Sequence, residues 1–422
     1  MPITLGCIAD DFTGATDLAN MLVKGGLKTI QLLGIPNQKD VDPSVEAVVI
    51  ALKTRTIPVR EAVSQSLQAL SWLKAVGTER FFFKYCSTFD STDEGNIGPV
   101  IDAFMADLEA SFTIACPAFP ETGRTIFKGH LFVGDKLLSD SPMRNHPLTP
   151  MTDSNLVSIL SRQSSLKVGL VQYQDVSGGA PKIKGAFNEL KREGVSIAVT
   201  DVLNDEHLHF LGEAVKEFKL ITGGSGIALG LPYHWKSGNG SKEGMTADQL
   251  PEVSGKELVL SGSCSEMTRA QVDEFSKNNR ALKLNPIELA KDTSALNKAI
   301  DWVIKAEIGR PILVYASAPP DTVKEIQQTL GQDLASSTVE NAMAKIASEA
   351  VKNGFRRIVV AGGETSGAVV SKLGINSILI GKEIDPGVPA TVSVGTPIIS
   401  LVLKSGNFGS VDFFEKAFKQ MP

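Results

Sequence analysis

The chain has 422 residues, 42% of them hydrophobic, and a formal net charge of −5. This length favours two or more domains over one. A negative net charge without any basic block argues against nucleic acid or an anionic membrane as the main partner. The N-terminus lacks a basic region, and no apolar run reaches the roughly 18 residues that span a bilayer. The four cysteines are scattered, without a CxxC pair, so a cytoplasmic protein with reduced thiols is expected.

Short apolar runs alternate with amphipathic segments, which predicts βαβ units and mostly parallel sheets. In the first half, strands are expected at residues 3–9, 45–52, 80–86, 112–118, 167–173, 195–201 and 219–222. In the second half they are expected at residues 257–261, 281–284, 312–316, 357–361, 377–380 and 399–403. The longest helical pattern spans residues 337–352. The predicted fold class is therefore α/β.

Residues 236–256 interrupt this rhythm, because they are rich in Gly, Ser, Lys and Glu and nearly lack apolar residues. Such a composition is typical of a linker or a long surface loop. The predicted domains are therefore residues 1–240 and 257–422, joined by a linker at 241–256. A second irregular region, residues 120–153, is too long for an idle connection and is expected to be a lid or binding loop.

Two adjacent carboxylates, Asp10 and Asp11, follow the first predicted strand, and Thr13 is the expected N-cap of the next helix. Both acids could simply favour the helix dipole, but one would be enough for that. A pair at a strand end more often binds a metal or a polyol, or acts as a base. The end of the first strand is therefore a candidate site.

Two further loops carry polar groups after predicted strands. Lys53 and Arg55 stand beside two threonines and suit a carboxylate ligand, although a solvated loop is the equal alternative. The loop that holds Ser87, Asp90 and Ser91 is dense in hydroxyls and acids, which recognise sugars. The same loop could instead cap the next helix, through Thr92 or Asn96. In the irregular region, His146 is a candidate general base or substrate contact.

Three glycine-rich turns follow strands in the second half. They are Ser261-Gly262-Ser263, the run Gly362-Gly363-Glu364-Thr365, and the turn around Gly406. Glycines let a backbone approach phosphate, and the free N–H groups of a helix start favour an anion. One such turn is ordinary, whereas three in one domain favour a nucleotide site. No GxxxxGK[ST] motif occurs, so the chain is not a P-loop NTPase.

Five motifs together resemble the four-carbon acid sugar kinase family, most closely its 3-oxo-tetronate 4-kinase members. They are IADDFTGATDLA, KYCSTFDSTDEGNIGPV, DSPMRNHPLTPM, VVAGGETSGAVV and LKSGNFG, which occur in the family's order and cover nearly the whole chain. The resemblance implies a sugar-acid-binding domain followed by a nucleotide-binding domain, each a mostly parallel sheet flanked by helices, with the active site in the cleft between them. It implies transfer of the γ-phosphoryl group of ATP to the 4-hydroxyl of a four-carbon acid sugar, most closely 3-oxo-tetronate.

Roles follow from the resemblance for individual residues. Asp11 or Asp10 would be the catalytic base. The residues that would contact ATP are Ser261, Ser263, Gly362, Gly363, Glu364, Thr365 and Gly406. Those that would face the sugar acid are Asp10, Lys53, Arg55, Ser87, Asp90, Ser91 and His146. Mg²⁺ would arrive with ATP and take one or two protein carboxylates, such as Glu364 or an N-terminal aspartate. Closure about residues 236–256 would exclude water.

Other hypotheses remain open at this point. The acceptor could be threonate or erythronate instead of the oxo-acid. A non-catalytic sensor of sugar acid and nucleotide would use the same two sets of residues. A dinucleotide-dependent oxidoreductase is weakened because Gly223-Gly224-Ser225-Gly226 lacks the complete fingerprint. A homodimer is a possible assembly.

Overall fold

The computed structural model describes residues 3–36, 41–146, 148–235 and 247–422. It divides into two compact units, residues 1–248 and 249–422, called here the N-terminal and C-terminal units. The first part of the predicted linker, residues 241–246, lies outside the described residues. None of the helices that the structure describes is long and apolar enough to cross a membrane.

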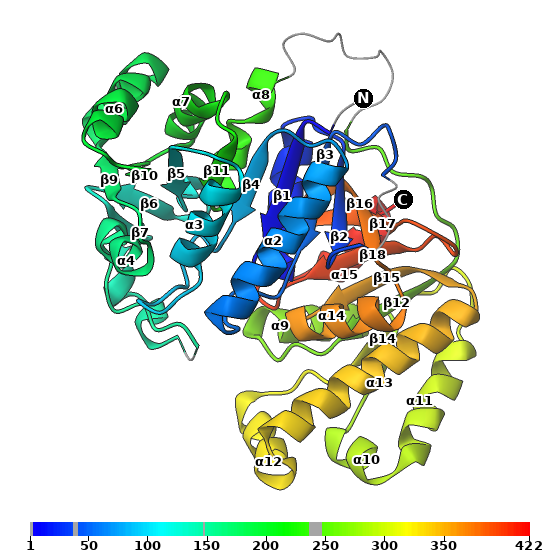
Figure 1. Ribbon diagram of the computed structural model, residues 1–422. Coiled ribbons are helices and arrows are strands. Elements are labelled where there is room, and N and C mark those ends of the chain that lie inside the picture. Colours follow the sequence, from blue (N-terminus) through cyan, green and yellow to red (C-terminus); the bar gives the residue numbers. More distant parts are fainter. Residues whose placement is uncertain (1–2, 37–40, 147, 236–246) are drawn as a thin grey trace. The chain divides into compact units, whose positions relative to one another are not determined.

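The N-terminal unit is built on a parallel sheet with the strand order β2-β3-β1-β4-β11-β5-β10-β9 (Figure 1). In that order the strands are Thr29–Leu33, Ala47–Ala51, Leu5–Ala9, Phe81–Lys84, Leu220–Gly223, Thr113–Cys116, Ile197–Thr200 and Val168–Val171. The helices α1 to α8 are Phe12–Lys24, Val59–Ala75, Ile97–Asp107, Leu156–Gln163, Tyr173–Val176, Ala180–Arg192, Asp205–Val215 and Pro232–Trp235. The 3₁₀ turns η1 to η4 are Pro120–Thr122, Leu138–Asp140, Pro142–Asn145 and Gly226–Leu229.

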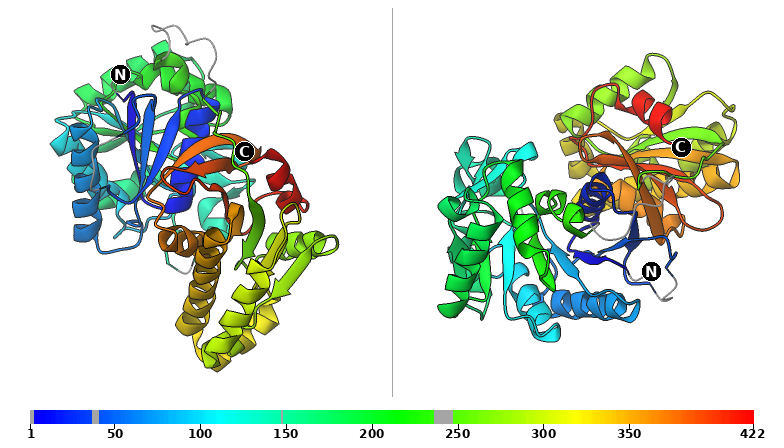
Figure 2. Two further views of the ribbon diagram at one scale, coloured as in Figure 1. Left: turned by 90° about the vertical axis from the view of Figure 1, so that its right-hand side faces the viewer. Right: turned by 90° about the horizontal axis from the view of Figure 1, so that it is seen from above.

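The order of strands around β1 creates a switch point at the strand end that Asp10 and Asp11 follow. From β1 the chain moves through α1 to β2 on one side, and from β3 it moves through α2 to β4 on the other. Right-handed crossovers in opposite directions put their helices on opposite faces. Both views in Figure 2 show α1 and α2 on opposite faces of this sheet. Ligands bind at such switch points, outside the carboxyl ends of the strands.

The region expected to be an irregular lid or loop, residues 120–153, is instead partly ordered as a small sheet. Its antiparallel strands are β6 (Arg124–Phe127), β7 (His130–Val133) and β8 (Lys136–Leu137). The buried carboxylate of Asp201 accepts hydrogen bonds from the backbone N–H groups of Lys128 and Gly129 at 2.9 Å each. This bond pair fastens the β6–β7 hairpin to the end of β10.

The C-terminal unit has the strand order β13-β14-β12-β15-β18-β17-β16. In that order the strands are Arg280–Lys283, Ile312–Tyr315, Lys256–Ser261, Phe355–Ala361, Ser400–Lys404, Val388–Ser393 and Ser377–Asp385. The helices α9 to α15 are Glu266–Ser276, Pro286–Lys291, Thr293–Ile304, Pro320–Leu330, Gln332–Lys352, Gly363–Lys372 and Phe413–Gln420. The first five strands in this order, β13, β14, β12, β15 and β18, are parallel to one another. Strand β17 is antiparallel to both of its neighbours, β18 and β16.

Helices cover this second sheet as well. The aromatic residues Phe275 of α9 and Phe413 and Phe414 of α15 are buried in a core with the apolar side chains of β12, β15 and β18. Helices α10, α11 and α12 pack against the long helix α13 (Figure 1). The predicted α/β class, with mostly parallel sheets flanked by helices, is confirmed.

Candidate functional sites at the strand ends

Asp10 and Asp11, which follow β1, both bind Arg55, which follows β3. The Arg55 guanidinium donates to both oxygens of Asp10, from Nε at 2.9 Å and from Nη2 at 2.8 Å. Nη2 also lies 2.5 Å from Oδ1 of Asp11. Because β1 and β3 are adjacent parallel strands, their carboxyl ends bring these side chains together. Asp11, not Thr13, is the N-cap of α1, since its carboxylate accepts from the N–H of Gly14 at 3.1 Å.

Asp90 adds a third carboxylate to this cluster. Its Oδ2 lies 3.4 Å from Nη1 of Arg55, and its Oδ1 accepts from the hydroxyl of Thr88 at 2.7 Å. The backbone of Phe89 and Asp90 has positive φ angles of 65° and 43°. Residues other than glycine rarely adopt this region, and when they do they cluster at functional sites. The cluster of Asp10, Asp11, Asp90 and Arg55 is called here the carboxylate cluster.

Asn96 holds the loop that carries Arg55. It is buried and does not cap α3 with its side chain, contrary to one expectation. Its Nδ2 instead donates to the carbonyls of Thr54 at 2.7 Å, of Ile57 at 2.9 Å and of Arg55 at 3.3 Å. A single amide thus fixes the backbone on both sides of Arg55. This role depends on a contact across 41 positions, which sequence spacing does not reveal.

The members of the carboxylate cluster differ in exposure and in pKa. The side chains of Asp10 and Asp90 are 6% and 9% exposed, whereas that of Asp11 is 29% exposed. Burial raises the pKa of Asp10, against the opposing effect of Arg55. Burial would also raise the pKa of Asp11, but Arg55, Lys84 and the N–H of Gly14 together hold it below its ordinary value. Asp11 is therefore an ionised carboxylate that solvent, and hence a ligand, can reach.

Lys84 is a cation that the sequence did not mark as a site residue. It ends β4, is 2% exposed, and donates from Nζ to the carbonyl of Tyr85 at 2.8 Å. A Cβ added to Gly14 would lie 2.8 Å from that Nζ, which places the ammonium at the start of α1. A positive charge here offsets part of the three carboxylates' repulsion.

The other expected substrate contacts are more dispersed. Lys53 is exposed and Ser87 is half-buried. Ser91 is buried, and its hydroxyl accepts from Nε2 of Gln163 at 2.9 Å. His146 bonds within its own loop, because its Nδ1 lies 3.1 Å from the N–H and 2.9 Å from the hydroxyl of Thr149. Among the predicted substrate contacts, Asp10, Arg55 and Asp90 are the ones that the structure brings into direct contact.

In the C-terminal unit the three glycine-rich turns meet. A Cβ added to Gly262, after β12, would lie 2.1 Å from the hydroxyl oxygen of Thr365 in α14. A Cβ on Gly406, after β18, would lie 2.6 Å from the hydroxyl oxygen of Ser263. The backbone N–H of Gly362, after β15, donates to the carbonyl of Lys404 at 2.9 Å. Glycine is needed at these turns because neighbouring side chains occupy the space that a Cβ would fill.

The start of α14 is suited to an anion. Its N-cap, Gly362, has a φ of 122° and supplies no side-chain hydrogen bond, so the first-turn N–H groups have no side-chain cap. Gly363 and Glu364 are exposed there, and Thr365 is buried. Unsatisfied N–H groups and the helix dipole favour phosphate. Ser261, in contrast, is fully buried and its hydroxyl lies 2.9 Å from that of Ser317.

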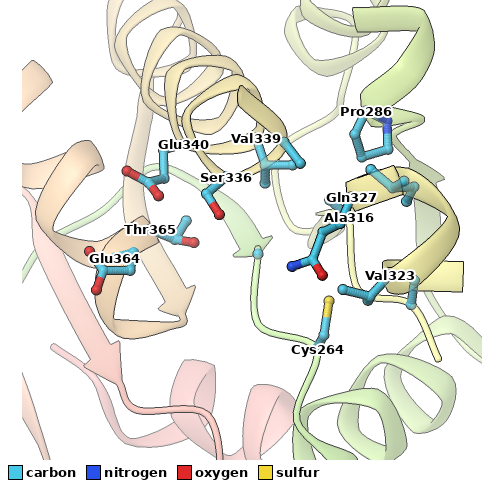
Figure 3. A pocket seen from close by; sticks show the side chains of 14 residues that line it. Cys264, Pro286, Ala316, Val323, Gln327, Ser336, Val339, Glu340, Glu364 and Thr365 are labelled. Atoms are coloured by element: carbon cyan, nitrogen blue, oxygen red, sulfur yellow. The ribbon is translucent and has the colours of Figure 1, made fainter. Parts of the chain in front are cut away.

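A pocket opens beside these turns. In Figure 3, Glu364 and Thr365 lie on one side of it, and Pro286, Val323 and Gln327 lie on the other. The full lining is Gly262, Cys264, Pro286, Ala316, Ala318, Val323, Ile326, Gln327, Ala335, Ser336, Val339, Glu340, Glu364 and Thr365. An apolar wall opposite a phosphate-binding turn suits a nucleotide base. The wall comes from α10, α12 and α13; a helix was predicted at residues 337–352, but none of these helices carries a motif, so their place in a site was not predicted.

Metal ligation was expected at Glu364. No group of three or more His, Cys, Asp or Glu side chains that could hold a metal occurs among the residues that the structure describes. Mg²⁺ that is bound mainly by nucleotide phosphates needs only one or two protein carboxylates. The exposed carboxylate of Glu364 at the start of α14 fits that requirement.

Comparisons with known proteins cover both units. Residues 5–231 match the model of a sugar-binding N-terminal domain, and residues 258–414 match that of a nucleotide-binding C-terminal domain. Proteins named 3-oxo-tetronate kinase from Burkholderia multivorans and Pseudomonas savastanoi pv. phaseolicola are 51% and 52% identical to the chain. Each match covers 99% of the chain and 97% of the relative. The solved structure of a Salmonella typhimurium LT2 protein, described as a candidate tRNA synthase, has a TM-score of 0.93 at 41% identity over 100% of both chains.

Proposed function

The chain belongs to the four-carbon acid sugar kinase family, and on this premise we propose that it phosphorylates the terminal (4-) hydroxyl of 3-oxo-tetronate with ATP. The products are 3-oxo-tetronate 4-phosphate and ADP. The relatives named 3-oxo-tetronate kinase span nearly the whole chain, so both units have counterparts in them. The observation that carries the proposal is the uncapped start of α14, where three glycine-rich turns meet beside an apolar pocket.

In this proposal the C-terminal unit binds ATP. The base lies in the pocket between α14 and the wall from α10, α12 and α13. The phosphates lie at Gly362, Gly363 and Thr365, with Ser263 and Gly406 beside them. Ser261 supports the turn from inside β12 through Ser317. Mg²⁺ neutralises phosphate charge when it is bound, and Glu364 is the residue that would hold it.

The N-terminal unit binds the acid sugar at the carboxylate cluster. Lys53 is exposed in the loop after β3 and pairs with the substrate carboxylate, with Arg55 beside it. Asp10 is buried and holds Arg55 through two hydrogen bonds, so it positions the guanidinium. The hydroxyl and oxo groups of the substrate are contacted by the remaining predicted residues, Ser87, Asp90, Ser91 and His146.

Asp11 is the proposed base. It is the most exposed carboxylate of the cluster, and its lowered pKa keeps it ionised at neutral pH. The 4-hydroxyl oxygen attacks the γ-phosphorus, the bond from that phosphorus to the ADP oxygen breaks, and the hydroxyl proton passes to Asp11. Phosphoryl transfer depends mainly on positioning and charge stabilisation, so a base is needed only as the proton leaves.

A coupled assay of ADP release, with 3-oxo-tetronate, threonate and erythronate as separate acceptors, tests the proposal. We expect the highest kcat/KM with 3-oxo-tetronate, and only background release without an acid. A higher kcat/KM with threonate or erythronate would identify that acid as the substrate instead. Calorimetric binding of ATP and acid without turnover would instead identify a sensor, and tighter binding of NAD than of ATP would indicate an oxidoreductase.

A further inference from the structure

Lys404 is a buried cation at the end of β18, next to the turn that contains Gly406. Its side chain is 1% exposed. The Nζ donates to the hydroxyl of Thr268 at 3.0 Å and to the carbonyl of Gly406 at 3.1 Å. Both acceptors are neutral, and no ion pair with Lys404 is found among the residues that the structure describes.

An unpaired ammonium in this position is costly. Burial lowers the pKa of Lys404 to about 8, with no opposing carboxylate. Buried lysines of this kind are rare unless they are paired, and perturbed cations gather at functional sites. A methionine of similar length would fill the same space without that cost. Lys404 therefore calls for an explanation other than packing.

The surroundings of Lys404 point to an anion. The carbonyl of Gly406 accepts three bonds, from Lys404, from the hydroxyl of Ser265 at 2.6 Å and from the hydroxyl of Thr268 at 2.7 Å. These donors fix the orientation of the turn that meets Ser263. Gly362, at the uncapped start of α14, donates its N–H to the carbonyl of Lys404 itself. The ammonium of Lys404 thus contacts the Gly406 turn, and the backbone carbonyl of the same residue contacts the start of α14, where the proposed phosphate site lies.

We propose that Lys404 is a positioning residue whose positive charge, held beneath the Gly406 turn, selects the charged phosphates of the nucleotide. The nucleotide's phosphates act as its counter-charge across the turn. This inference rests on the proposed binding of ATP by the C-terminal unit. It adds a cation to a site whose other expected contacts are glycines, hydroxyls and one glutamate.

The test compares Lys404→Met with a matched control, Lys372→Met. Lys372 is exposed at the opposite end of α14, so its substitution removes the same charge without touching the turns. Binding of ADP and of adenosine is measured calorimetrically at pH 7, where Lys404 is charged. We expect Lys404→Met to weaken ADP binding on the order of tenfold or more, because it removes a full charge from a low-dielectric site. The affinity of Lys404→Met for adenosine should stay within about twofold of the wild-type affinity. The control variant should bind ADP and adenosine as the wild type does.

Three results would overturn the inference. One is unchanged ADP binding by Lys404→Met. Another is an equal loss of ADP and adenosine binding, which would mean that Lys404 only maintains the turn. A third is a loss of ADP binding of the same size in Lys372→Met, which would mean that net charge alone matters. Wild-type protein that binds no ADP would contradict the proposed function instead.

Discussion

At the scale of single residues, the two adjacent aspartates of the carboxylate cluster differ in exposure, and the proposed function gives them different roles. Asp10 is buried, and each of its two oxygens accepts a hydrogen bond from Arg55. Asp11 is more exposed, and it also caps α1. Both carboxylates contact Nη2 of Arg55, so the greater exposure of Asp11, and not a different direction, suits it to meet a ligand.

The substitution Asp11→Asn separates the proposed role of Asp11 as a base from its role as the N-cap of α1. Asparagine caps helices about as well as aspartate but loses the ion pair with Arg55, so the free energy of unfolding should fall by about 1 to 3 kcal/mol. It accepts no proton, so kcat should fall by roughly 10²- to 10⁴-fold, while the KM for ATP stays close to that of the wild type. Steady-state kinetics and urea unfolding check both parts. If kcat stayed within about threefold of the wild type, Asp11 would not be the base.

Lys404 predicts a pH dependence of stability. Its pKa is lower in the folded protein, about 8, than in the unfolded chain, near 10.4. Between these values the unfolded chain binds more protons, so rising pH stabilises the fold with respect to this group. Lys404→Met should therefore unfold at higher urea than the wild type at pH 7, and the difference should narrow by pH 10. Urea unfolding of ligand-free proteins at both pH values measures it. A difference that is constant with pH would contradict the lowered pKa.

At the scale of elements, α14 carries glycines of left-handed backbone at both ends, and only one lies at the proposed phosphate site. Gly362 has a φ of 122° and precedes the helix, whereas Gly374 has a φ of 67° and follows it. An alanine at either position should cost about 1 kcal/mol of stability. Gly362→Ala should in addition raise the KM for ATP by roughly tenfold or more, because it moves the N–H groups at the start of the helix. Equal effects of both variants on KM would show that the site is not at this end.

The same scale shows what the sequence could predict. Strands with continuous apolar runs, such as β1 and β3, were placed to within two residues, because fully buried parallel strands carry no polar positions. Strand β2 was missed since the polar residues Thr29 and Gln31 break its apolar run, although both are buried. Strand β17 was missed because Pro389 argues against a strand. Strands β6 and β7 are as short as the predicted strands β4 and β5, but they are only partly buried and begin with polar residues, so they lack a continuous apolar run.

The candidate sites divide in a similar way. Asp10, Asp11 and the glycine-rich turns could be chosen as candidates from the sequence, because their signals lie within a few neighbouring residues. Asn96, Lys84 and Lys404 could not, because each acts on a segment from another strand end or turn. Their contacts depend on which strands lie side by side, and one sequence does not give the strand order.

At the scale of the whole molecule, each unit has its own sheet and helices, and each holds one half of the proposed chemistry. Ligand binding should therefore protect different amides in hydrogen exchange. ADP should slow exchange at residues 261–266, 362–366 and 405–409, and the acid sugar at residues 10–14, 53–57 and 86–92. NAD at the same concentration, as a control, should slow neither set. Protection by ADP at the N-terminal set alone would contradict the assignment of the two units.

The left-handed backbone at Phe89 and Asp90 has a consequence for how this sequence can change over generations. A positive φ at position 90 costs a non-glycine residue about 1 kcal/mol or more, and glycine would remove this cost. Selection for stability alone should therefore favour glycine at this position. Glycine would also delete the carboxylate that faces Arg55 and Thr88. A random library at this position, selected first for folding and then for growth on the acid sugar, should therefore enrich glycine in the first round and aspartate in the second.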